Sequence, residues 1–97
     1  MTDKERRPLP YAKAKAAFEA VPAWVREDLY LALTWARNEL TLHEGSGHNF
    51  EIAYDEREEG FVACFAKPEW NADHCSQPMN TAQEAIIMAV CEYLNGV

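Results

Sequence analysis

Apolar residues recur at helical spacing over the first forty or so residues of the chain. Four of them share one side of a first predicted helix, which Pro10 can start: Tyr11, Ala14, Phe18 and Val21. Pro22 ends this helix, because proline is tolerated in a first turn but not in a helix interior. It also opens a second helix, which the pattern predicts to run without a break to about Leu42.

The second predicted helix has apolar residues on more than one face. One stripe contains Val25, Leu29, Ala32, Leu33, Ala36 and Leu40, and another contains Trp24, Leu31, Trp35 and Leu42. A surface helix needs only one apolar stripe. This helix is therefore either sandwiched between the first helix and a sheet, which aromatic residues at this spacing favour, or it presents its tryptophans to a partner.

The pattern then changes to alternation, which is typical of half-buried strands. Residues 50–54 predict one strand and residues 61–66 a second, and the second is expected to be central because it is apolar on both faces. The turn between them is expected to use Gly60 for a positive φ. A third short strand can fit between Trp70 and Gln77, although prolines flank that segment.

Thr81 and Glu84 have the spacing of a capping box at the start of a last helix, which Asn95-Gly96 ends. The predicted class is therefore α+β, with two N-terminal helices, a small antiparallel sheet and a C-terminal helix packed on that sheet. Residues 10–97 are expected to form a single domain after a flexible leader at residues 1–9.

The net charge is unevenly distributed along the chain, and this distribution indicates which kind of partner to expect. The total is −7, and the first fifteen residues carry +3, which leaves −10 on the remainder. Such a body should be repelled by phosphate backbones and by anionic lipid headgroups, so neither nucleic acid nor membrane is expected to bind directly. A basic protein surface that ordinarily holds nucleic acid is the better electrostatic partner.

The acidic residues concentrate around the turn at residues 55–60, where Arg57 is the single cation. A turn of this kind is either a solvated hairpin tip or a docking surface for a positive partner. For the second interpretation, the expected partner-binding residues are Glu44, Glu51, Asp55, Glu56, Glu58 and Glu59. Four other residues would add an apolar patch beside this acidic rim if they were exposed together, and otherwise pack in the core: Tyr30, Trp70, Ile87 and Met88.

The three cysteines are odd in number and have no CxxC spacing. Residues 1–10 are polar, so no signal peptide is expected, and no apolar run is long enough to span a bilayer. We therefore expect reduced thiols in a cytoplasm, with no structural disulfide and with Cys64 buried and free.

Candidate chemistry is sparse. Five side chains could ligate zinc, but their spacing fits no closed zinc motif: His43, His48, Cys64, His74 and Cys75. The histidines are expected to be solvated loop residues. A dyad of His74 and Cys75 is disfavoured, since neighbours on an extended segment point to opposite faces. The sequence predicts no catalytic residue, no metal, no cofactor and no enzyme activity.

Three segments carry a resemblance to a known family: residues 49–54, 60–65 and 81–90. They resemble small phage and prophage proteins of the phage ABA-sandwich type, which combine a helix, an aromatic hairpin and an alanine-rich last helix opened by Thr-Ala. The chain departs from that pattern in its long acidic turn and in the lead-in at residues 21–24. The resemblance implies a phage or mobile-element origin, where many small acidic proteins inhibit host nucleic-acid machinery.

Together with the charge, this resemblance predicts an anti-CRISPR-type inhibitor that binds a host CRISPR-Cas effector. It would mimic DNA in the effector's basic nucleic-acid groove, in the cytoplasm of the host cell. The alternative is a non-catalytic protein-interaction or self-associating module, either monomeric or a homodimer that pairs through Trp24, Leu31 and Trp35.

Overall fold

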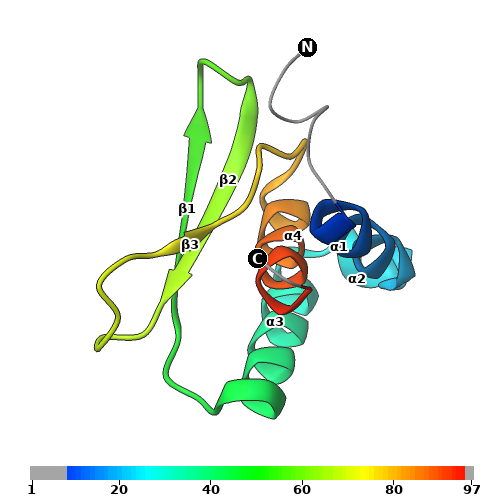
Figure 1. The fold of residues 1–97 in the computed structure, drawn as a ribbon. Helices are drawn as coiled ribbons and strands as arrows, with labels where there is room; N and C mark the ends of the chain where they lie inside the picture. The colour runs from blue at the N-terminus through cyan, green and yellow to red at the C-terminus, as the bar shows by residue number, and fades with distance from the viewer. Residues whose placement is uncertain (1–8, 96–97) are drawn as a thin grey trace.

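The computed structural model describes residues 9–95, and the chain forms four helices and one sheet in this range (Figure 1). The elements in chain order are α1 (Leu9–Ala20), α2 (Ala23–Arg26), α3 (Leu29–Glu44), β1 (Asn49–Asp55), β2 (Gly60–Ala66), β3 (His74–Cys75) and α4 (Ala82–Leu94). The predicted α+β class is confirmed, as is a last helix packed on an antiparallel sheet. Residues 1–8 of the expected leader lie outside the described range, and Leu9 already belongs to α1.

The prediction of one continuous second helix is wrong, because the chain breaks between α2 and α3. Asp28 has an extended backbone, with φ −125° and ψ 123°, and its side chain accepts a hydrogen bond from Leu31 N at 2.9 Å. An aspartate at this position satisfies a backbone N–H that would otherwise be free at the start of α3. The apolar periodicity continues across residues 27 and 28 and gives no sign of this interruption.

The sheet has the order β1-β2-β3 and is antiparallel throughout. β2 is therefore central, as predicted, and the third strand exists. The cross-strand pairs Phe50↔Phe65, Ile52↔Ala63 and Tyr54↔Phe61 share one face of the sheet. Figure 1 shows all four helices on one side of the sheet, with α4 between it and α1.

α4 is buried almost all round and divides the core into two clusters. One cluster joins α4 to α1, α2 and α3 through Phe18, Val25 and Ile87, among others, and the second joins it to α3 and the sheet around Phe65 and Ile86. The helix sandwiched between the first helix and the sheet is thus α4. Ile87 and Met88 are buried, so the apolar patch that would have included them does not form.

The stripe of tryptophans predicted on the second helix divides between core and surface. Leu31 and Trp35 pack against the core, whereas the Trp24 side chain is 65% exposed and Leu42 is also exposed. The break at Asp28 separates Trp24 from the other stripe residues by placing it on a different helix. A homodimer through a continuous stripe of Trp24, Leu31 and Trp35 therefore has no such surface to use.

The expectation that no structural disulfide forms is wrong, because Cys64 and Cys75 are bonded to each other. The short strand β3 pairs with β2 so that the two cysteines lie directly opposite one another. The remaining cysteine, Cys91, is free and buried in α4, a state that was predicted for Cys64. The expectation of three reduced thiols is therefore wrong for Cys64 and Cys75.

Candidate functional site

The acidic turn at residues 55–60 is held by hydrogen bonds to Asp55. Asp55 Oδ1 accepts hydrogen bonds from the backbone N–H groups of Arg57, at 2.9 Å, and Glu58, at 3.2 Å. An aspartate that binds its own turn in this way fixes the backbone conformation. The side chains of residues 56–59 are exposed. The turn therefore presents its glutamates to solvent from a defined position.

Gly60 does not supply the positive φ predicted for this turn, since the residue with φ 53° is Glu59. Gly60 is needed for a different reason: a Cβ atom built on it would lie 2.8 Å from Pro78 Cβ and 3.1 Å from Met79 O. The segment before α4 thus approaches the start of β2 too closely for a side chain at position 60. This contact attaches the base of the acidic turn to the segment leading into α4.

The structure brings five of the six predicted partner-binding residues onto one hairpin. Asp55, Glu56, Glu58 and Glu59 lie at its tip, and Glu51 is exposed on the face of β1 away from the helices, where it pairs with Cys64. By strand geometry, Glu51 and Asp55 lie about 13 Å apart on that face. The carboxylates thus form a line that leads to the tip.

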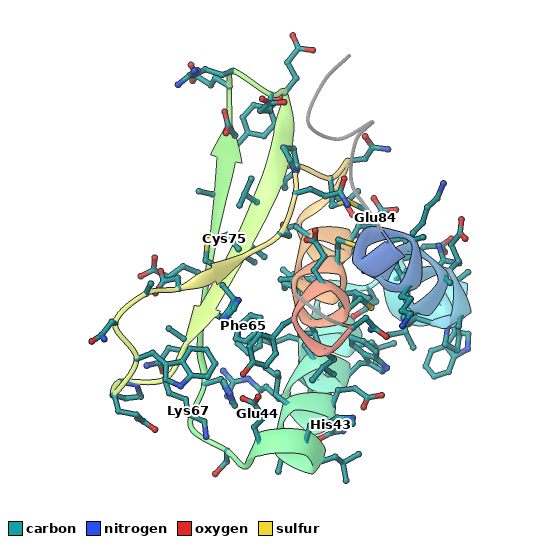
Figure 2. All side chains as sticks on the ribbon, in the orientation of Figure 1. His43, Glu44, Phe65, Lys67, Cys75 and Glu84 are labelled. Carbon is teal, nitrogen blue, oxygen red and sulfur yellow. A yellow bond between two sulfur atoms is a disulfide. The ribbon has the colours of Figure 1, made fainter. Side chains whose placement is uncertain are left out.

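Glu44 lies apart from this line, at the end of α3, near the other end of the hairpin (Figure 2). Its carboxylate accepts a hydrogen bond from the Tyr93 hydroxyl, and its carbonyl accepts one from Lys67 Nζ at 2.8 Å. The hydrogen bond to the Glu44 carboxylate raises the pKa of Tyr93 to about 12. Glu44 therefore ties α3 to α4 and to the segment after β2.

The prediction that the histidines are solvated loop residues is wrong for His48, and also for His74, which lies half-buried on β3. The His48 ring makes edge contacts with Phe65 and Trp70, at centroid distances of 5.8 and 5.4 Å, and is buried. Burial lowers the pKa of His48, as does the positive charge of Lys67, although Glu44 Oε1, 3.7 Å from Nε2, acts in the opposite direction. His48 is thus a neutral core residue near neutral pH.

An aromatic cluster at the base of the sheet went unrecognised in the sequence. Trp70, His74 and Tyr93 surround Phe65, with the His74 and Tyr93 rings closest at 4.4 Å. This cluster holds β3 and the loop before it against α4. A sequence signal was present in the aromatic residues themselves, but they are far apart along the chain and only the pairing of β3 brings them together.

Among residues 9–95, the imidazole and carboxylate groups do not converge into a metal centre. His43 is exposed on the last turn of α3, and its Nε2 lies 4.0 Å from Glu39 Oε2. Within residues 9–95, no group of three or more His, Cys, Asp or Glu side chains is arranged to hold a metal ion.

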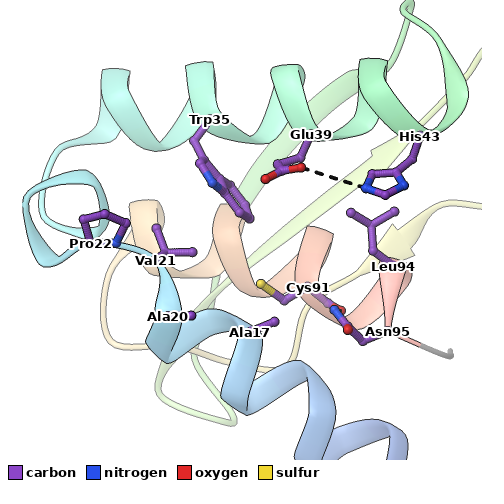
Figure 3. A pocket seen from close by; sticks show the side chains of 10 residues that line it. All are labelled: Ala17, Ala20, Val21, Pro22, Trp35, Glu39, His43, Cys91, Leu94 and Asn95. Atoms are coloured by element: carbon purple, nitrogen blue, oxygen red, sulfur yellow. Dashed lines mark hydrogen bonds and ion pairs between the residues drawn. The ribbon is translucent and has the colours of Figure 1, made fainter.

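A separate pocket of about 390 Å³ lies between α1, α3 and α4 (Figure 3). Its lining comprises Ala17, Ala20, Val21, Pro22, Trp35, Glu39, His43, Cys91, Leu94 and Asn95. The Cys91 thiol is the potential nucleophile here, but burial, together with the charges of Glu39 and Glu92, raises its pKa to about 12. The thiol is protonated at neutral pH, so the pocket lacks an activated nucleophile.

Comparison of the chain with protein-family models, with curated proteins and with solved structures found no match to any of them. The resemblance to phage ABA-sandwich proteins therefore stays a prediction. Among the helices of residues 9–95, none combines the length and the apolar character that a membrane span requires.

Proposed function

We propose that this protein is a non-catalytic inhibitor that docks its acidic hairpin on the basic groove of a nucleic-acid-handling protein. The observation that carries the proposal is the set of exposed carboxylates at the tip, formed by Glu56, Glu58 and Glu59 on a turn whose backbone donates two hydrogen bonds to Asp55. The tip extends beyond the helices, so a concave partner can reach it (Figure 1). Preorganised charge of this kind favours fast, oriented association with a complementary surface.

The line of carboxylates supports mimicry of a nucleic-acid backbone. Glu51, Asp55 and the tip follow one another along the outer side of the hairpin, and a row of lysines and arginines can pair with them in sequence. The resemblance to phage ABA-sandwich proteins supplies the partner class, a host CRISPR-Cas effector, and hence the host cytoplasm as the place of action. The mechanism is occupation of the groove that would hold target DNA, without a chemical step.

The test is the binding of target DNA by a purified CRISPR-Cas effector, measured by electrophoretic mobility shift with increasing amounts of this protein. We expect the wild-type protein to release DNA, and less so as the salt concentration rises, because exposed charges are screened. The triple variant E56K/E58K/E59K should no longer inhibit.

The matched control is E19K/E27K/E69K, which changes the net charge equally at three exposed acids away from the acidic tip. It should inhibit like wild type if the position of the charge matters. Equal loss in both triple variants would show that total charge alone is responsible, and full inhibition by E56K/E58K/E59K would refute the docking of the tip.

A further inference from the structure

β1 is the outer strand of the sheet, and within residues 9–95 no other strand pairs with its free side. Phe61 and Met79 exchange two backbone hydrogen bonds, of 2.7 and 2.9 Å, so Phe61 directs its N–H and C=O away from β1. These directions alternate along antiparallel strands. The residues of β1 that pair with Phe61, Ala63 and Phe65 therefore direct their own N–H and C=O toward the free edge: Phe50, Ile52 and Tyr54.

The same part of β1 exposes apolar side chains. Ile52 and Tyr54 lie on the helix side of the sheet, yet they remain 41% and 54% exposed. The reason is that the helical layer covers β2 and the start of β1, where Phe50 packs on the core, but not the half of β1 near the turn. β1 contains no proline, lysine or bulge, which are devices that block many edges, and its two charged residues, Glu51 and Asp55, lie on the face away from the helices.

We propose that β1 pairs antiparallel with β1 of a second copy of this chain, with Ile52 on the two-fold axis. Phe50 then lies opposite Tyr54 of the second copy, and about six backbone hydrogen bonds form across the axis. On the helix side, the exposed apolar groups of each copy cover those of the other. The two sheets become one continuous sheet, and the two acidic tips point in opposite directions.

The charges of β1 disfavour the two neighbouring registers, and the register centred on Ile52 uses all three residues whose backbone groups face the free edge, Phe50, Ile52 and Tyr54. With Ile52 on the axis, Glu51 lies opposite Ala53 of the second copy, and Asp55 lies opposite Asn49. If Glu51 lay on the axis instead, it would be opposite Glu51 of the second copy. If Ala53 lay on the axis, Glu51 would be opposite Asp55 of the second copy. Side chains directly opposite are about 4.5–5.5 Å apart at Cβ, where like charges destabilise the pair.

A second copy also suits the strand better than a basic peptide. Such a peptide could pair with Glu51 and Asp55, but only a strand that is apolar on one side covers Ile52 and Tyr54, and β1 itself is such a strand. The interface is small and belongs to the class that buries less than about 1,200 Å² of accessible surface, so association is expected to be weak. The test therefore needs a wide range of protein concentrations.

Sedimentation of the purified full chain should show a reversible monomer–dimer equilibrium. Ile52→Lys places two like charges on the axis and should weaken dimerisation at least tenfold, with the circular dichroism spectrum unchanged. The matched control is Trp24→Lys, which removes an exposed apolar side chain on α2 and should dimerise like wild type. A monomer at every concentration, or a dimer sensitive to Trp24→Lys and not to Ile52→Lys, overturns the proposal.

The register has its own test. Under mild oxidation, Ile52→Cys should form an intermolecular disulfide across the axis, while Tyr54→Cys should not, because its two copies lie several residues apart. Cross-linking through Tyr54→Cys alone overturns the register. None of these measurements contains a partner protein, and E56K/E58K/E59K should still dimerise, so failure of the proposed inhibition and failure of the dimer are separate results.

Discussion

Cys64 on β2 and Cys75 on β3 lie directly opposite one another, with their Cα atoms 4.0 Å apart and their sulfur atoms bonded. β3 has only two residues, so few ladder hydrogen bonds hold it. Ser76 adds two contacts, because its N–H donates to Ala63 O and its hydroxyl accepts from Ala63 N. The disulfide is the covalent link that keeps this edge of the sheet in register.

Removal of the disulfide in the double variant C64A/C75A should lower the free energy of unfolding by about 3 kcal/mol, the loss expected for a loop of this length. Urea unfolding measures the change. A reducing agent should lower the stability of wild type and leave the double variant unaffected. Equal stability of wild type with and without reductant would contradict a stabilising bond.

Gly60→Ala should destabilise the protein by about 1–3 kcal/mol, the range for an overpacked site. The added Cβ meets Pro78 and the backbone of Met79, neither of which can move without shifting the segment before α4. Thermal unfolding followed by circular dichroism measures the loss. Ser46→Ala, in an exposed loop, is the control and should stay within about 0.5 kcal/mol of wild type.

Stability should fall on the acid side of neutrality because of His48. Its pKa is lowered in the folded state by burial, so the unfolded chain takes up the proton first as the pH falls. The stabilising contribution of neutral His48 is present above its unfolded pKa of 6.5 and is lost as the pH falls from there toward the lower folded value.

The measurement is urea unfolding across this pH range for wild type, His48→Phe and the exposed control His43→Gln. His48→Phe keeps a ring against Phe65 and Trp70 but cannot titrate, so its stability should depend less on pH. His43→Gln should follow the wild-type curve. Parallel curves for wild type and His48→Phe would rule out this role of His48.

Asp28→Ala should cost about 1 kcal/mol, because the first turn of α3 loses the side-chain acceptor for Leu31 N. Glu27→Ala, one residue earlier and equally exposed, tests whether charge alone is responsible and should have little effect. Chemical denaturation of both variants compares them directly. A stability loss of the same size in both would show that the cap is not the cause.

Cys91 should resist alkylation in the native protein. Its thiol pKa is raised to about 12, so almost no thiolate is present at neutral pH, and the side chain is also buried. Mass spectrometry after iodoacetamide should find no label on folded protein and a single label after unfolding without reductant. Two or three labels in that unfolded sample would show that Cys64 and Cys75 are not bonded.

The acidic tip and the main elements could be predicted because their signals are local. The capping contact of Thr81 with Glu84 N, at 3.2 Å, involves residues three apart, and the apolar content of β2 sufficed to place it in the centre of the sheet. Asp28 also carried a local cap signal, which the continuous apolar periodicity around it concealed.

The sequence by itself thus determined the class of fold, the order of its elements and the concentration of charge on one hairpin, since side-chain periodicity and charge belong to neighbouring residues. The tertiary structure alone decided that Cys64 meets Cys75, that His48 is buried and that Glu44 lies apart from the tip. Each of these depends on strand register or on contacts between elements far apart in the chain. Such contacts follow from how the whole core packs, and no short window of residues encodes them.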